Sequence, residues 1–311
     1  RSSAASDVYK RQEYTMLNVI LETCAGTLTQ GLIYAILSYG IFITYKILDF
    51  PDLTVDGSFP LGAAVTAVLL THGVNAWLTL PIALVIGALA GLCTGLIHVR
   101  ARVRDLLAGI ITMTALYSIN LQIAGSNLMV ERAIDTIYTS APVMALLGSV
   151  PLLYRKLIVS LVLVVLIGLV LEWYFSTKNG LLLRAVGDND TLVTTLAVDK
   201  GSMKILALVA LSGCIVCQEG RSFSATMGTG QMVFGLAAVI IGTTLFRRMS
   251  FVKGTAAVVI GSILYKACIQ IAILLGLPGN MLKFITAALF LVILITGNLS
   301  GRKGGADRAG A

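Results

Sequence analysis

Two polar residues lie four positions apart in an apolar run near the end of the chain. A helix over this run would place Lys266 and Gln270 on one face. Charged groups within a membrane are costly and often functional, so the ammonium could attract the carboxylate of a solute. It could equally pair with a neighbouring helix or extend toward the membrane surface. The sequence leaves both interpretations open, and both residues are candidates for a translocation path.

Further candidates for the wall of such a path are hydroxyl, amide and carboxylate side chains within or beside apolar runs. They are Asp56, Thr112, Thr114, Asn120 and Gln122. Asp56 flanks a short apolar run, where it could either fix the entry of that run or lie in a vestibule for the solute. None of these residues is expected to carry out covalent chemistry.

Residue patterns typical of catalysis and metal binding are absent. His72 and His98 lie far apart, and neither H-E-x-x-H nor G-x-S-x-G occurs. Cys214 and Cys217 form a C-x-x-C pair without a second pair or a nearby histidine. We therefore interpret them as small residues at helix contacts. The sequence predicts no enzyme, no metal site and no cofactor.

Composition indicates which class of protein must position these side chains. The chain has 311 residues, of which 57% are hydrophobic and 12% are charged, whereas soluble domains have about 25% charged residues. The net charge is +8, but the basic residues stand in short loops between apolar runs. That pattern is typical of membrane proteins and argues against nucleic-acid binding.

Apolar runs follow one another along almost the whole chain. They cover residues 20–45, 57–70, 77–99, 103–124, 157–175, 205–217, 232–246, 255–277 and 282–296. A straight crossing takes about 20 residues, so runs 57–70 and 205–217 must be half-helices, be tilted, or extend through polar neighbours. We predict an all-α, polytopic membrane protein of about eight or nine transmembrane helices, one or two of them short or broken.

A single transmembrane domain is expected over residues 16–300. Residues 1–15 are polar and lack the apolar core of a signal peptide. We expect them to be a non-native leader, with Met16 as the true start. Residues 301–311 are expected to form a cytoplasmic tail.

The positions of the basic residues predict the orientation. They gather over residues 100–104, 178–204, 247–253 and 302–308. If every run crosses once, all four groups lie on one side, which would be the cytoplasm, and the N-terminus lies outside. If run 57–70 re-enters instead, the count is eight and the N-terminus lies inside. The stretch 125–153 is then extracytoplasmic, either as a docking surface or as a plain connection.

Two local patterns concern helix packing. Gly87, Gly91 and Gly95 recur every fourth residue, which lets two helix backbones approach closely in lipid. In addition, GSFPLGAA from Gly57 is similar to GQMVFGLAA from Gly230. The two stretches would cross in opposite directions, as in transporters built from inverted repeats. Chance similarity between Gly/Ala-rich helices is the other interpretation.

A polar stretch in the middle of the chain is predicted to contact a cytoplasmic partner. Its leucines and Arg184 could form a short surface helix that ends at Gly187, with Asp188 before the next helix. A plain solvated loop would not need this order of leucines and glycines.

Five stretches, in order, resemble ABC importer permeases of the branched-chain amino acid type. They are ILDFPDLTVDGSFPLGAA, DLLAGIITMTALYSINLQIAG, GLLLRAVGDND, MKILALVALSG and MGTGQMVFGLAAVIIGTTLF. The likeness is greatest to tryptophan/tyrosine-type permeases that depend on a substrate-binding protein. It covers about residues 27–299.

The resemblance implies a permease subunit in the bacterial inner membrane that imports a small solute, and amino acids are the first class of solute to consider. The segment that couples to an ATPase subunit would include Gly180, Arg184, Ala185, Gly187, Asp188 and Asn189. Implied partners are that cytoplasmic ATPase, a second permease copy or paralogue, an extracytoplasmic substrate-binding lipoprotein and membrane lipid. The chain has no G-x-x-x-x-G-K-[ST] motif of its own.

The sequence departs from the family pattern around 204–221. The run at 205–217 looks shortened, and Glu219 and Arg221 replace small or neutral residues. These two could pair at the outer interface. An alternative function is a stand-alone secondary transporter, which would need ionisable residues deep in its helices, and Lys266 is the clear case here. The sequence does not identify the solute or distinguish a permease homodimer from a heterodimer.

Overall fold

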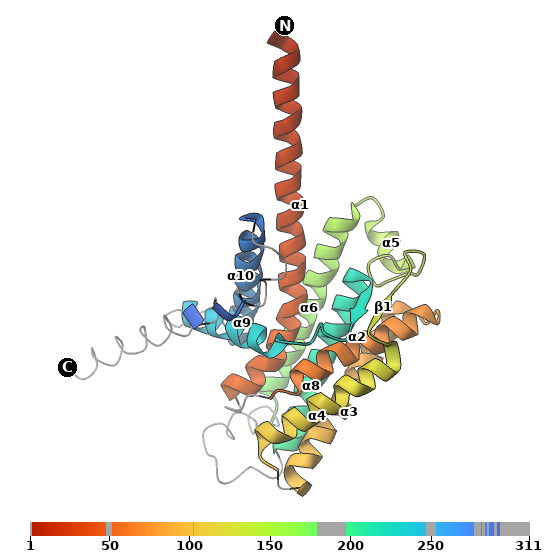
Figure 1. Cartoon of the computed structure of the whole chain (residues 1–311), viewed down its shortest axis with the longest axis vertical. Coiled ribbons are helices and arrows are strands. Elements are labelled where there is room, and N and C mark those ends of the chain that lie inside the picture. The colour runs from red at the N-terminus through yellow and green to blue at the C-terminus, as the bar shows by residue number, and fades with distance from the viewer. Residues whose placement is uncertain are drawn as a thin grey trace, which may run out of the picture.

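A computed structural model describes residues 2–47, 52–101, 103–178, 197–246 and 253–276, together with isolated positions between 281 and 292. These residues form a bundle of helices (Figure 1). In chain order the elements of the first half are α1 (Ser2–Phe42), the π-helical turn η1 (Ile43–Ile47), α2 (Val55–Thr71), α3 (Ala76–Ala101), α4 (Asp105–Ala124), β1 (Asn127–Met129) and α5 (Ala141–Leu147). The second half consists of α6 (Leu152–Ser176), α8 (Ala197–Gly220), β2 (Ser222–Ser224), α9 (Gln231–Leu245) and α10 (Gly254–Leu274).

Five of these helices are long and apolar enough to cross a membrane. They contain the spans Val19–Tyr45, Ala76–His98, Leu106–Ala124, Leu152–Ser176 and Gly254–Leu274. Three shorter apolar helices accompany them: Val55–Thr71, Leu206–Gly220 and Gln231–Leu245. The prediction of a helical membrane protein with short helices is therefore confirmed. The last predicted run, 282–296, lies mostly outside the described residues, so the helix number of eight or nine stays a prediction.

The two runs that looked too short have different outcomes. Run 57–70 is the short helix α2, with 17 residues. Run 205–217 instead belongs to α8, which has 24 residues because it extends through the polar neighbours on its N-terminal side. Helix α9, with 15 residues, is shorter than α2.

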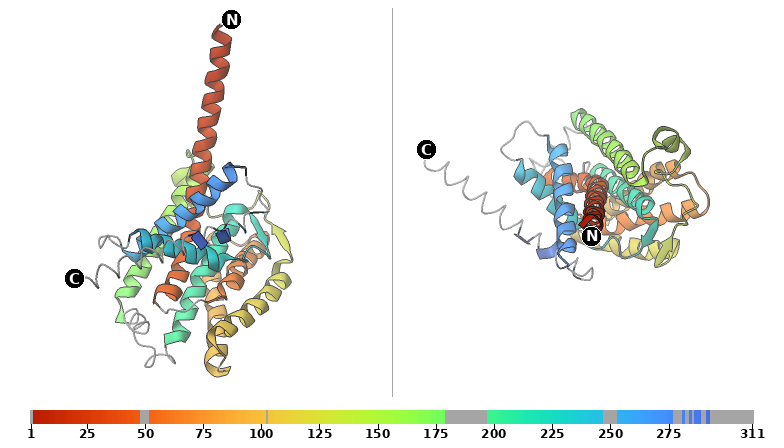
Figure 2. Two further views of the ribbon diagram at one scale, coloured as in Figure 1. Left: turned by 60° about the vertical axis from the view of Figure 1, so that its left-hand side comes forward. Right: turned by 90° about the horizontal axis from the view of Figure 1, so that it is seen from above.

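The N-terminal part of α1 projects out of the bundle, as the left-hand view of Figure 2 shows. The helix runs without a break from Ser2 to Phe42. Whether residues 1–15 are a foreign leader stays a prediction.

Small residues allow the close helix contacts of the core. A Cβ on Gly87 of α3 would meet Ala210 of α8, and Gly91 and Gly95 are also buried. Gly31 of α1 lies against Ile263 of α10. In lipid, where apolar burial drives association little, such close backbone packing holds helices together.

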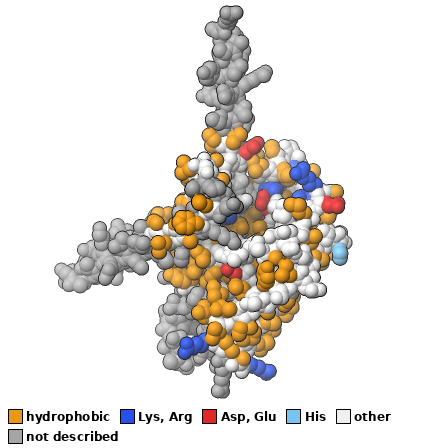
Figure 3. Space-filling view, viewed as in Figure 1, with side chains coloured by type: hydrophobic (Ala, Val, Ile, Leu, Met, Phe, Trp, Pro, Cys, Tyr) orange, Lys and Arg blue, Asp and Glu red, His pale blue; other side chains and the backbone are white. Residues whose placement is uncertain are grey.

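Two ends of the bundle can be defined from these contacts. Helices α3 and α8 are antiparallel, since Gly87 lies against Leu206 while Thr79, earlier in α3, lies against Cys214, later in α8. The C-terminus of α3 therefore meets the N-terminus of α8. Lys253, before α10, contacts Glu172 near the end of α6. We call the end that carries the C-terminus of α3, the N-terminus of α8 and Lys253 the basic end, at the bottom of Figures 1 and 3.

The opposite end, called the outer end, carries a small two-stranded sheet that the sequence did not predict. Strands β1 and β2 are antiparallel, with Asn127 opposite Ser224 and Met129 opposite Ser222. Three residues per strand are too few to show an alternating pattern. The sheet joins the stretch after α4 to the connection between α8 and α9.

Candidate functional site

Helices α2 and α9 begin beside each other and run in opposite directions. The carboxylate of Asp56, in the first turn of α2, accepts hydrogen bonds from the backbone N–H groups of Gly230 (3.0 Å) and Met232 (2.8 Å). These N–H groups belong to the start of α9, which would otherwise leave them without partners. Gly230 has φ +87°, so the chain can turn sharply into the helix. Asp56 thus fixes the start of α9 as well as lying at the start of α2.

Each short helix packs against the long helix of the other half of the chain. Gly62 of α2 lies directly against the backbone of Ala210 in α8, while Gly235 of α9 lies against Ile41 of α1. Gly62 and Gly235 occupy the same place in the two similar stretches. This crossed packing, with opposite helix directions, is the symmetry expected of an inverted repeat. It favours the repeat over chance similarity.

A cavity of about 360 Å³ opens at the start of α9, between α1, α9 and α10. Gly230 and Gln231 line one side of it, and Lys266 of α10 lines another. The Lys266 Nζ atom lies 3.6 Å from the centroid of the Tyr34 ring and 5.2 Å from that of Phe234. The two rings are 4.9 Å apart. The arrangement places a cation and an aromatic wall at the interface of the two repeats.

The predicted path residues on α4 are divided between two faces. Asn120 is buried, and its amide donates to the carbonyl of Gly57 at 3.1 Å, close to Asp56. Thr112 is buried and donates to Ala108 O within its own helix. Thr114 and Gln122 lie on the exposed face of α4.

Gly230 lines the same cavity as Lys266, and its N–H group donates a hydrogen bond to Asp56. Gln270 is partly exposed, one turn after Lys266, and is not part of the cavity wall. That these side chains line one translocation path stays a prediction.

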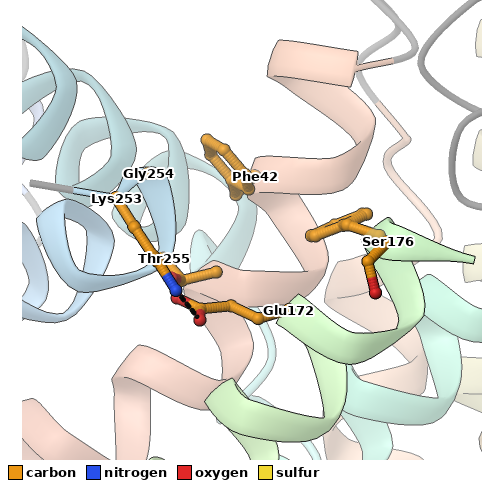
Figure 4. Close-up of a pocket in the computed structure, with 7 residues that line it drawn as sticks. Phe42, Glu172, Ser176, Lys253, Gly254 and Thr255 are labelled. Atoms are coloured by element: carbon orange, nitrogen blue, oxygen red, sulfur yellow. Dashed lines mark hydrogen bonds and ion pairs between the residues drawn. The ribbon is translucent and has the colours of Figure 1, made fainter. Parts of the chain in front are cut away.

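At the basic end, three side chains tie α6 to α10 (Figure 4). Glu172 forms an ion pair with Lys253 at 2.6 Å, and it accepts a hydrogen bond from Thr255 Oγ1 at 2.7 Å. Phe42 and Ser176 complete the wall of a cavity of about 480 Å³ here. The predicted coupling residues, Gly180 to Asn189, follow α6 directly but lie outside the described residues.

At the outer end, the expected pairing of Glu219 with Arg221 is wrong. Glu219 instead forms an ion pair with Lys156 at 2.9 Å. The guanidinium of Arg221 donates to the carbonyls of Glu131 (2.8 Å) and Ile134 (2.7 Å). Neighbours in sequence point to different partners here, because the helix ends between them. A cavity of about 810 Å³ is lined in part by Glu131, Lys156, Glu219 and Arg221.

Sequence reasoning also missed Gln218, which is 1% exposed. Its Oε1 accepts from Ile137 N at 2.9 Å, and its Nε2 donates to Thr79 Oγ1 at 2.8 Å. The Gln218 side chain therefore connects α8, to which it belongs, with Thr79 of α3 and with Ile137 in the stretch between β1 and α5. A lone amide at the end of an apolar run was the only signal. Burial also raises the pKa of nearby Tyr138, whose hydroxyl lies 3.3 Å from Ser160 Oγ.

Comparison with known proteins adds the following similarities. A family model described as the permease component of branched-chain amino acid transport systems matches residues 23–294. A tyrosine transport system permease protein of Clostridioides difficile is 37% identical over 281 residues, covering 88% of this chain and 91% of that protein. An uncharacterised protein of Rickettsia prowazekii is 32% identical, with 70% and 76% covered. The ribose import permease protein of Haemophilus influenzae is 25% identical, with 74% and 68% covered. No solved structure matches the chain.

Proposed function

Because this chain belongs to the family of branched-chain amino acid transport system permease components, we propose that it forms the translocation path of an ABC importer for an amino acid. As a family member it is a multi-pass protein of the bacterial inner membrane. The tyrosine transport function named for its relative makes tyrosine the first substrate to test. ATP would be hydrolysed by a separate subunit.

The observation that carries the proposal is that the starts of α2 and α9 meet at Asp56. Transporters that move small solutes commonly bind them at the midplane, where the broken helices of two inverted repeats meet. Here Asp56 joins the two helix starts, and the cavity beside Gly230 opens at the same place. A solute could therefore pass where two repeats adjoin.

The basic end supports coupling to an ATPase. Helix α6 ends at Ser176, directly before the predicted coupling segment, and the Glu172–Lys253 ion pair connects this end of α6 to the start of α10. Helix α10 carries Lys266. A displacement of the coupling segment would be transmitted through the Glu172–Lys253 ion pair to α10, and so to the cavity that Lys266 lines. We therefore propose that the ATPase binds at the basic end.

Two further partners are proposed. The outer end, with its cavity between Glu131, Lys156 and Arg221, is our candidate surface for the substrate-binding lipoprotein. The exposed face of α4 carries Thr114 and Gln122 among apolar residues, whereas the exposed face of α6 carries leucines, valines and Trp173. Polar groups facing lipid are unfavourable, so we propose α4 rather than α6 as the contact with a second permease copy or paralogue.

Reconstitution tests the proposal. The permease, the ATPase encoded beside it and the binding protein are placed in liposomes, and uptake of labelled tyrosine is measured with and without internal ATP. We expect ATP-dependent uptake, and we expect Arg184→Glu or Gly187→Leu to abolish co-purification of the ATPase. Arg132→Glu, a charge reversal on an exposed residue of the outer end, is the control that should retain it. Uptake driven by an ion gradient without any ATPase would refute the proposal and favour a secondary transporter.

A further inference from the structure

The cavity between α1, α9 and α10 has the ammonium group of Lys266 on its wall. Lys156 and Lys253 each form an ion pair with a glutamate. Lys266, within the described part of the chain, has neither an acidic partner within 4.0 Å nor a hydrogen bond, and its ammonium lies over the Tyr34 ring. A lysine in a membrane-spanning helix without a counter-ion is costly unless it serves a function.

We propose that this cavity is a substrate site in which Lys266 binds the carboxylate of an amino acid and the Tyr34 and Phe234 rings hold its apolar side chain. The inference rests on the proposed function, because it assumes that an amino acid is transported. It adds which group of the solute is recognised and by which residue.

The shape of the cavity fits one small solute. Its volume of about 360 Å³ lies near the lower end of ligand pockets, which range over about 300–1,000 Å³. Val233 and Ile269 extend the apolar wall beyond the rings. Phe234 is itself held in place by Tyr265, with an edge-to-face contact at 4.9 Å between centroids. A preformed aromatic wall next to one cation suits an amino acid with an aromatic or large apolar side chain.

The ammonium is available to a carboxylate. It lies over the faces of Tyr34 and Phe234, and a contact with a ring face leaves N–H donors unused. A solute carboxylate would provide a charge-assisted hydrogen bond, which is the stronger interaction. The start of α9 does not compete for that carboxylate, because Asp56 already occupies the N–H groups of Gly230 and Met232.

A binding experiment on the complete permease–ATPase complex in lipid nanodiscs tests the inference. L-tyrosine is the probe, detected by saturation-transfer NMR, and two analogues compete with it. We expect 3-(4-hydroxyphenyl)propionate, which keeps the carboxylate, to displace tyrosine. We expect tyramine, which lacks it, to compete at least tenfold more weakly. Equal competition by the two analogues would overturn the proposal, and this comparison needs no variant.

Variants add a second measurement. Lys266→Met keeps the length of the side chain but removes the charge, and we expect tyrosine to bind about tenfold to a hundredfold more weakly, the value of one charge-assisted hydrogen bond. Lys266→Arg should retain most of the affinity. Cys268→Ala, on the exposed face of the same helix, is the control. Unchanged binding in Lys266→Met would overturn the proposal.

Failure of this inference can be told apart from failure of the proposed function. ATP hydrolysis stimulated by the tyrosine-loaded binding protein reports on the importer as a whole. If hydrolysis and uptake are normal and Lys266→Met binds and transports tyrosine like the unaltered protein, the importer stands and this site is refuted. If the unaltered complex shows neither stimulated hydrolysis nor uptake, the proposed function is refuted.

Discussion

Replacement of Asp56 by alanine tests the contact that joins the two halves of the chain. The substitution removes both hydrogen bonds that the start of α9 donates to the Asp56 carboxylate, from Gly230 N at 3.0 Å and from Met232 N at 2.8 Å. It also removes a negative charge from the positive end of that helix. The first turn of α9 should then open more often than the rest of the helix.

The size of the effect follows from the two bonds. Loss of a helix N-cap costs about 0.5–2 kcal/mol, and a hydrogen bond to a charged group contributes about 1.5–3 kcal/mol. The Gly230 bond is exposed, so water can replace it, whereas the Met232 bond is partly buried. We therefore expect Asp56→Ala to lower the local opening free energy by about 1–3 kcal/mol. Asp56→Asn keeps one acceptor oxygen and should lose about half as much.

Hydrogen exchange followed by mass spectrometry measures this opening in detergent-solubilised protein. Protection of the amides over residues 230–234 should fall by about five- to 150-fold in Asp56→Ala, since 1.4 kcal/mol corresponds to a factor of ten. Protection in α10 should stay within a factor of two or so of the unaltered protein. Equal protection of residues 230–234 in both proteins would show that Asp56 does not hold the start of α9.

Three other substitutions test the packing. Gly62→Leu should destabilise the bundle by about 1–3 kcal/mol or prevent folding, because the new side chain would clash with the backbone of α8. Gly26→Ala, at an open position, is the control and should not lower the melting temperature in detergent. Gln218→Leu should lower the free energy of unfolding by about 1–3 kcal/mol, because the buried Ile137 N–H group loses its acceptor. The effect should be seen as faster tryptic cleavage within the stretch 125–153. Glu172→Gln should change the free energy of unfolding by less than about 1 kcal/mol, because its partner Lys253 is 73% exposed. A drop in melting temperature that corresponds to a larger loss would contradict this.

Some of the candidate site could be predicted from the sequence. The similarity of the stretches from Gly57 and Gly230 indicated an inverted repeat, and the polar residues Asp56 and Lys266 stood out because so few charges interrupt the apolar runs. Their partners could not be predicted. Which N–H groups Asp56 would cap, and which ring would lie under Lys266, depend on contacts between segments more than 170 residues apart.

The error at the outer end has the same origin. Glu219 and Arg221 are two residues apart, which made a pair plausible, but α8 ends at Gly220 and the chain changes direction there. Lys156, on α6, provides the partner for Glu219. A spacing in sequence indicates a shared face only while one regular element continues.

The sequence by itself determined that this protein is a helical membrane protein, because apolar length and scarcity of charge are properties of each segment alone. Its motifs also determined the family. Only the tertiary structure decided that α2 and α9 start side by side, that Gly62 and Gly235 each contact the opposite half, and that a cavity with Lys266 on its wall lies beside the start of α9. The physical reason is that the rotation of each helix and the choice of its neighbours are set by close packing of side chains from distant parts of the chain.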